Sequence, residues 1–272
     1  MEPIRLENDS GLALITLNDS SNGNTLTAHS LTALAQALTD AVHDDSVRAI
    51  LLRSDGPAFC TGMSLSDAGA KPLGTGEFGN TISLYCECLL KIYRAPKPVV
   101  CCITGDVKAG GVGLVSACDI VVASPGATFQ LSEIFLGMIP ANVLPFLFSL
   151  RLAPQTVRYL VLTGKKLSAQ EALAIQLVNE VVPAETLERD LRALIKGLFR
   201  ASPKAVARAK QFTGMLYGEK MDPSIELAKN SFTEMMREPE ITKAISDFND
   251  GYSPSWFSPF SPKNSLLCKG AV

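Results

Sequence analysis

A glycine-rich segment between two apolar runs constrains the fold of this chain most strongly. The run "PVVCCI" ends at residue 103, "KAGGVGLVSACD" follows from residue 108, and "DIVVA" begins at residue 119. Short apolar runs predict buried strands, and the glycines predict a tight turn into a helix. The first N–H groups of such a helix have no intrahelical acceptor, so we expect this turn to bind something negative.

The same alternation of strand and helix extends over most of the chain. Residues 12–17 ("LALITL") and 49–54 ("AILLRS") are strand-like, and apolar residues at helical spacing lie between them. From about Pro183 the pattern becomes purely helical. We therefore expect an α/β core over residues 1–195 and a helical module over residues 196–251. The tail, residues 252–272, is rich in Ser and Pro and should be irregular, either disordered or held down by its aromatic residues.

Composition excludes several classes of function. The 272 residues carry 25 basic and 27 acidic side chains with no basic block, which argues against nucleic-acid binding. No apolar stretch approaches the roughly 18 residues of a membrane span, and the first residues do not resemble a signal peptide. The seven cysteines form no CxxC pair, so we expect reduced thiols and a soluble, cytoplasmic protein.

Several sequence motifs match known functional patterns but lack the context that those functions require. The stretch "GTGEFG" (74–79) matches GxGxxG, but no strand precedes it, so a loop is favoured over a nucleotide site. His29 and His43, the only histidines, have no metal-ligand spacing and offer little material for a Ser-His-Asp triad. We expect no metal and no bound cofactor.

Three elements do indicate chemistry. A turn at Gly62 after a strand leaves the N–H of Met63 without a ladder partner, and the N–H of Gly110 opens a helix. Two such donors converging on one point would form an oxyanion hole. The alternative is that each segment is only a tight turn at the end of a strand, and for either turn alone this alternative is favoured. Glu133 lies between apolar stretches, either as a charge at a helix N-terminus or as a buried acid with a raised pKa.

In this order, these elements resemble the crotonase (enoyl-CoA hydratase/isomerase) superfamily. The resemblance covers about residues 12–210 and rests on "NTLT", "AFCTGMSL", "KAGGVGLVSACDIVVAS", "FQLSEIFLGMIP" and "LTGKKLSAQEALAIQLVNEVV". It implies an α/β spiral of ββα units with a helical C-terminal module that drives trimer formation. It also implies oxyanion donors at the backbone N–H groups of Met63 and Gly110, and an acid/base at Glu133.

Departures from the family pattern suggest a narrower group. The second glutamate of the family's hydratases corresponds to Gly113 here, and "ANVLPFLF" replaces the usual glycine-rich continuation. These features resemble polyketide-pathway dehydratases that act on 3-hydroxy-3-methylglutaryl thioesters during β-branching. The resemblance implies a substrate tethered to an acyl carrier protein and a homotrimer or hexamer. Lys108 and Asn142 are candidates for the acyl pocket, Lys108 for a distal carboxylate.

Two alternatives stay open at this stage. One is a hydratase or isomerase acting on free acyl-CoA, and the other is a non-catalytic binding protein with the same fold. The neighbourhoods "DSSNGNTLT" and "GMSLSD" contain no basic residue for the coenzyme A phosphates, which favours the carrier-bound substrate. If Lys204, Arg208 or Lys210 from the C-terminal helices bound these phosphates instead, the alternative of free acyl-CoA as substrate would be favoured.

Overall fold

The computed structural model describes residues 2–65, 77–217 and 220–257, and its strands divide into two sheets. Parallel pairing dominates both, and antiparallel pairs occur at an edge of each sheet. The larger sheet has the order β1 (Ile4–Asp9), β2 (Leu12–Leu17), β3 (Ala49–Ser54), β5 (Val99–Ile103), β7 (Ile120–Ala123), β10 (Glu180–Val181). The smaller has the order β4 (Ala58–Cys60), β6 (Asp106–Lys108), β8 (Thr128–Gln130), β9 (Leu167–Ser168).

From β3 to β8, successive strands alternate between the sheets, so the chain advances as a spiral. β3 enters the large sheet and β4 the small one before α2; β5 and β6 repeat this before α3, and β7 and β8 before the turn at Glu133. The helices are α1 (Ala28–His43), α2 (Glu77–Arg94), α3 (Gly110–Ala117), α4 (Leu144–Phe146), α5 (Pro154–Thr163), α6 (Ala169–Ala174), α7 (Leu187–Phe199), α8 (Pro203–Tyr217), α9 (Met221–Met235) and α10 (Pro239–Asn249). Shorter turns are η1 (Ser20–Asn22), η2 (Glu133–Leu136) and η3 (Leu147–Arg151). The predicted α/β spiral with C-terminal helices is confirmed.

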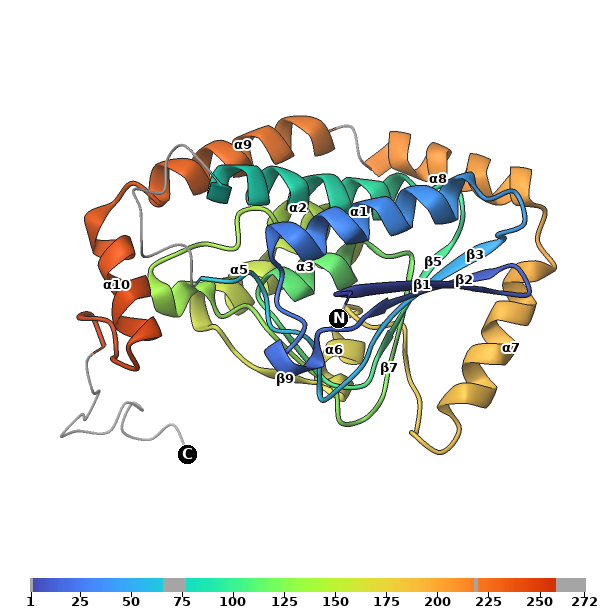
Figure 1. Ribbon diagram of the computed structural model, residues 1–272, viewed down its shortest axis with the longest axis horizontal. Helices are drawn as coiled ribbons and strands as arrows, with labels where there is room; N and C mark the ends of the chain where they lie inside the picture. The colour runs from blue at the N-terminus through green and yellow to red at the C-terminus, as the bar shows by residue number, and fades with distance from the viewer. Residues whose placement is uncertain (1, 66–76, 218–219, 258–272) are drawn as a thin grey trace, which may run out of the picture.

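The local sequence explains the elements nearest the site. Every residue of β5 is buried, as expected for a central parallel strand that reads as a continuous apolar run. Thr27 caps α1 through a capping box with Ser30. Together α1, α2 and α9 form a helical layer over the strands, while α7 stands against the large sheet (Figure 1). The site lies between this layer and the ends of the small sheet.

The helical C-terminal region begins with α7 and continues through α10. Residues 195 and 196, the predicted limit of the core, fall inside α7, so the division into core and module stays a prediction. No helix in the described ranges is long and apolar enough to cross a membrane. Of the motif "GTGEFG", residues 74–76 lie outside the described residues, and Gly79 belongs to α2.

Candidate active site

The segment after β4 presents one unpaired backbone N–H. Gly62 has φ +96°, a conformation that favours glycine, and the chain then runs alongside Leu26. Leu26 N–H donates to Gly62 O at 2.8 Å, and Ser64 N–H donates to Leu26 O at 2.9 Å. Because neighbouring residues of an extended chain point their N–H groups to opposite sides, the Met63 N–H points away from Leu26. It has no acceptor in the described part of the chain.

A second unpaired N–H comes from the start of α3. Ala109 holds φ +47° and donates its N–H to Gln130 O at 2.9 Å, which turns the chain out of β6 into the helix. Gly110 is the first helical residue, so its N–H lacks an intrahelical acceptor. A Cβ on Gly62 would lie 3.4 Å from Gly110 N and 2.9 Å from the Ala109 Cβ. The two segments are therefore in direct contact, and Met63 and Gly110 line one cavity.

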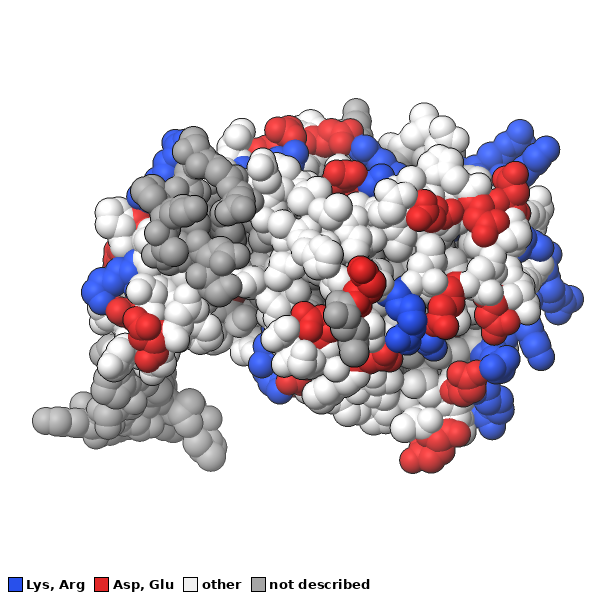
Figure 2. All heavy atoms as spheres, viewed as in Figure 1, with Lys and Arg blue, Asp and Glu red and all other residues white. Residues whose placement is uncertain are grey.

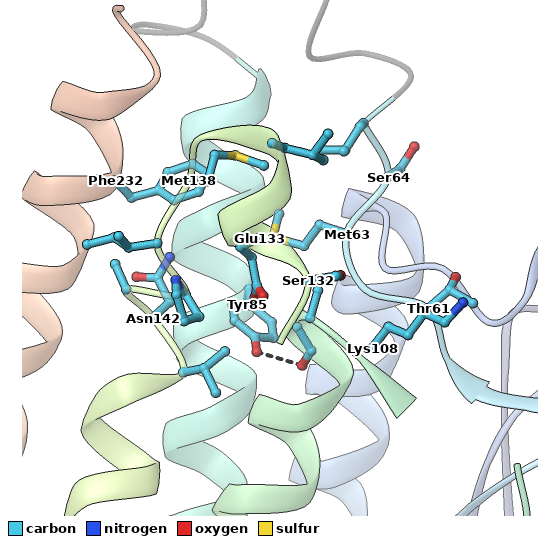
Figure 3. Close-up of a pocket in the computed structure, with 18 of the residues that line it drawn as sticks. Thr61, Met63, Ser64, Tyr85, Lys108, Ser132, Glu133, Met138, Asn142 and Phe232 are labelled. Atoms are coloured by element: carbon cyan, nitrogen blue, oxygen red, sulfur yellow. Dashed lines mark hydrogen bonds between the residues drawn. The ribbon is translucent and has the colours of Figure 1, made fainter. Parts of the chain in front are cut away.

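Glu133 begins η2 and extends its carboxylate into the same cavity (Figure 3). Its Oε2 is buried and has no hydrogen-bond partner among the described residues. Burial raises the pKa of Glu133 to about 7, and backbone N–H groups of Glu133 and Ser132 only partly oppose that rise. Glu133 therefore combines both sequence-based alternatives: it lies in the first turn of η2 and accepts from backbone N–H groups there, and burial outweighs those bonds. A carboxyl group with this pKa can accept and return a proton near neutrality.

The cavity has a volume of about 420 Å³ and brings together all five predicted site residues. Glu133 is the only acidic residue, and Lys108 the only basic one, among the described residues that line it. The lining also contains hydroxyl and amide groups and a wall of apolar side chains. The lining residues are Thr25, Thr61, Met63, Ser64, Leu65, Tyr85, Lys108, Ala109, Gly110, Ser132, Glu133, Leu136, Met138, Ile139, Pro140, Ala141, Asn142, Val143, Phe232, Phe248 and Asn249.

Lys108 and Asn142 each bring donors that are not used elsewhere. Lys108 ends β6, and no hydrogen bond or ion pair engages its ammonium group within the described ranges. Asn142 is buried, and its Oδ1 accepts from the Cys86 thiol at 3.5 Å. Its amide N–H groups have no acceptor among the described residues, so both side chains can donate to a ligand in the cavity.

Sequence reasoning missed part of this lining. Tyr85 comes from α2, Phe232 from α9, and Phe248 and Asn249 from the end of α10. Tyr85 sits in the apolar pattern of its helix and looks like an ordinary core residue. The other three belong to amphipathic helices far along the chain, and only tertiary packing shows that they close the site.

The tail also reaches this region. A Cβ on Gly137, directly after η2, would lie 2.9 Å from the ring of Trp256. Trp256 therefore packs against the turn that carries Glu133. Residues 258–272 lie outside the described part of the chain.

No group of three or more His, Cys, Asp or Glu residues suited to a metal ion occurs within the described residues. The six cysteines described are buried and free. Burial raises the pKa of the Cys60 and Cys88 thiols to about 12. These thiols are protonated and pack as small apolar groups.

An alternating two-sheet spiral, two free N–H groups and one buried carboxyl group define an enzyme of the crotonase type. The family model described as enoyl-CoA hydratase/isomerase matches residues 7–259, and the chain belongs to this family.

Named relatives carry different reactions. A Thermus thermophilus protein named "Putative enoyl-CoA hydratase" is 31% identical over 89% of this chain and 96% of its own. The Escherichia coli 1,2-epoxyphenylacetyl-CoA isomerase is 26% identical over 94% of this chain and 98% of its own. A Bacillus subtilis structure named "Putative polyketide biosynthesis enoyl-CoA hydratase" has a TM-score of 0.83 at 26% identity, covering 92% of this chain and 98% of that one. The protein is thus a crotonase-family enzyme whose particular reaction the relatives leave open.

Proposed function

We propose that this enzyme is a hydro-lyase that dehydrates a 3-hydroxy-3-methylglutaryl thioester to a 3-methylglutaconyl thioester. The observation that carries the proposal is that Glu133 brings the one carboxyl group of the described lining, together with the N–H groups of Met63 and Gly110, which have no acceptor among the described residues. One acid/base group must then perform both proton transfers. Syn elimination from a β-hydroxy thioester has this requirement.

In the proposed reaction, the thioester oxygen accepts hydrogen bonds from the two N–H groups. Ionised Glu133 removes a proton from the carbon next to the thioester, and the C–H electron pair forms an enolate. Backbone donors aimed at the developing oxyanion are typically worth about 10²–10³ in rate each. The enolate then expels the hydroxyl group from the neighbouring tertiary carbon, which forms the C=C bond. Protonated Glu133 returns its proton to that oxygen, so water leaves and the carboxylate is restored.

Lys108 and Asn142 suit the remaining polar groups of this substrate. Lys108 is the cation proposed for the distal carboxylate, because it lines the cavity and its ammonium has no hydrogen bond or ion pair among the described residues. The Asn142 amide can donate to the acyl group from the opposite wall. The apolar lining, including Met138 and Phe232, suits the methyl branch. Each polar group of the substrate has a chemically suitable counterpart.

We further propose that the acyl group is carried by a phosphopantetheinylated carrier protein. Lys108 is the only basic residue in the described lining, whereas coenzyme A presents a diphosphate and a 3′-phosphate. Lys210 is already held by Asp119 at 2.6 Å and by Lys97 O at 3.0 Å. The Bacillus subtilis structure named for polyketide biosynthesis supports a carrier-bound substrate in the same way.

A cytoplasmic location accords with a carrier protein as partner. On the face in Figure 2, Lys and Arg are interspersed with Asp and Glu, so nucleic acid is not the proposed partner.

A hydratase or isomerase acting on free acyl-CoA is the second candidate, favoured by the names of the Thermus thermophilus and Escherichia coli relatives. The test measures kcat/KM for the same acyl group on carrier protein, on coenzyme A and on pantetheine. We expect at least about tenfold preference for the carrier over coenzyme A, which is about 1.4 kcal/mol of transition-state binding. The pantetheine thioester shows whether the preference comes from the carrier surface. Equal efficiency with coenzyme A would favour the second candidate, and no turnover of any thioester would indicate a binding protein.

We also propose that the chain assembles as a homotrimer or as a hexamer of two trimers. Phe212, Met215 and Leu216 of α8 are each more than half exposed and lie on one helix face, at i, i+3 and i+4. Such a face is suited to a symmetric interface. Light scattering should give a mass of about 87 kDa, three chains of 29.0 kDa, or a multiple of it. A monodisperse monomer would contradict this assembly.

A further inference from the structure

Tyr85 joins α2 to the start of α3 beneath the cavity. Its side chain is 1% exposed, and its hydroxyl donates to the carbonyl oxygen of Gly110 at 2.6 Å (Figure 3). Gly110 also lines the cavity, and as the first residue of α3 its N–H has no intrahelical acceptor. A buried side chain from a separate helix therefore holds the residue that supplies one of the two backbone donors.

The same hydroxyl explains a glycine that backbone geometry does not require. Gly113 lies inside α3 and has no positive φ, and glycine is unfavourable at helix interiors. A Cβ on Gly113 would lie 2.0 Å from the Tyr85 Oη, 3.1 Å from its Cζ and 3.3 Å from Val143 Cγ2. Tyr85 thus occupies the space that a side chain at position 113 would need. Tyr85 and Val143 both line the cavity, so this space adjoins the reacting groups.

We propose that Tyr85 is a positioning residue for the oxyanion donor of Gly110, and that it also keeps the site to one carboxyl group by excluding any side chain at position 113. The first half rests on the proposed oxyanion role of the Gly110 N–H. The second half depends only on the packing of Tyr85 against Gly113.

Three hydrogen bonds fix the peptide groups around Gly110. Ala109 N–H donates to Gln130 O at 2.9 Å, Val112 N–H donates to Ala109 O at 2.9 Å, and Tyr85 holds the Gly110 carbonyl. The first two are made by backbone groups of the turn and sheet. The Tyr85 bond is the one made by a side chain, at a place where Ala109 already holds an unusual φ. Without it, the first turn of α3 and the direction of the Gly110 N–H are held less firmly.

The chemistry of Tyr85 suits positioning rather than proton transfer. Burial, followed by the nearby Cys86, Cys60 and Glu133 groups, raises the pKa of Tyr85 well above its usual value. The phenol therefore keeps its proton through the catalytic pH range and remains a permanent donor. Glu133 is left as the group that gains and loses a proton.

The first test compares Tyr85→Phe with Tyr93→Phe, a matched control on the same helix whose ring packs edge-on against Phe146. Tyr85→Phe should lower kcat about 10- to 100-fold with KM changed less than about threefold, since misplacement of a donor acts on the transition state. Hydrogen exchange of a peptide spanning residues 109–114 should become faster. The control should change neither quantity. Unchanged kcat together with unchanged exchange would overturn the positioning role.

The second test needs no substrate. Gly113→Ala should strongly destabilise the parent protein, which raises its unfolding equilibrium constant. In the Tyr85→Phe background the same substitution should raise that constant by a factor at least about tenfold smaller. An equal cost in both backgrounds would overturn the exclusion of a side chain by Tyr85. If the parent protein turned over no thioester, the proposed function would fail, while hydrogen exchange and this cycle would still decide the two structural claims.

Discussion

Replacing Glu133 by glutamine should remove catalysis and at the same time stabilise the protein at alkaline pH. Burial without a partner for Oε2 raises the pKa of Glu133 from its ordinary value near 4.5 to about 7. Between these two values the unfolded chain has released its proton while the folded protein still binds it. The contribution of Glu133 to stability is therefore complete below about pH 4.5 and is lost as the pH rises through about 7.

The magnitude follows from the two pKa values. The interval from 4.5 to about 7 corresponds to about 3 kcal/mol of unfolding free energy. Glutamine has nearly the same shape and carries no charge. The unfolding free energy of the variant therefore does not fall as the pH rises through about 7. Urea unfolding at about pH 4.5 and about pH 8.5, at one protein concentration, measures it. Relative to the parent protein, Glu133→Gln should gain about 3 kcal/mol between the two conditions.

A surface control gives the opposite dependence. The exposed carboxyl of Glu171 is bonded by Lys165, and also by the backbone and hydroxyl of Ser168, and these bonds lower its pKa to about 2. The stabilising effect of Glu171 is present above its ordinary pKa and is lost as the pH falls. Relative to the parent protein, Glu171→Gln should therefore gain no unfolding free energy between about pH 4.5 and about pH 8.5. If Glu133→Gln changed stability equally at both pH values, within about 0.5 kcal/mol, Glu133 would not be desolvated.

Activity of the same variant completes the test. In the parent protein, kcat/KM should rise as the pH passes about 7, because the ionised carboxylate is the base. Glu133→Gln should lose at least about a thousandfold in kcat/KM, near the upper end of acid/base effects, with an unchanged circular dichroism spectrum. Activity within about tenfold of the parent would refute the assignment of Glu133.

Two further substitutions probe the donors around Glu133. Gly110→Val should lower kcat at least about 100-fold while light scattering shows an unchanged assembly, because a Cβ there already lies 3.3 Å from Leu26 and the γ-carbons must enter the cavity. Met63→Leu, which leaves the backbone N–H in place, is its control; unaffected turnover in Gly110→Val would place the oxyanion site elsewhere. Lys108→Gln should raise KM about tenfold for a thioester with a distal carboxylate and leave a 3-hydroxybutyryl thioester unaffected. Equal effects on both substrates would refute the proposed role of Lys108.

The sequence predicted the parts of the site that depend on local chain geometry. The proposed donor at Met63 follows a turn at Gly62, with φ +96°, whereas the turn before Gly110 is made by Ala109, with φ +47°. Both turns lie at the ends of strands and are encoded within a few residues. Glu133 stands out by its apolar neighbours, and the structure buries its Oε2, while its role as acid/base stays a prediction. Lys108 and Asn142 line the same cavity, while their roles stay predictions.

The remainder depends on packing between elements that are far apart in the chain. The hydrogen bond from Tyr85 to Gly110 spans 25 residues, and Phe232 approaches the cavity from α9, well over 100 residues beyond α3. In both cases the residue occurs in a helical apolar pattern that is equally compatible with a core position. Gly113 shows the same limit, since the sequence indicated only a missing glutamate and the structure shows that Tyr85 fills its space.

The electrostatics of Glu133 and Lys108 link the proton transfer to the choice of substrate. A nearby cation would lower the pKa of a carboxyl group, yet the Glu133 pKa is raised to about 7, with burial as the leading cause. Lys108 lines the same cavity and is not among the groups that shift the Glu133 pKa; its side chain extends toward Thr61 (Figure 3). In the proposed reaction, Glu133 keeps a pKa suited to taking a proton and giving it back, and Lys108 is the cation proposed for a negative group of the substrate. In the proposed complex, pairing with Lys108 would offset the negative charge of a substrate carboxylate, which by itself would raise the pKa of Glu133 further. This pairing is therefore required if the cavity is to hold an anionic acyl chain while Glu133 performs both proton transfers.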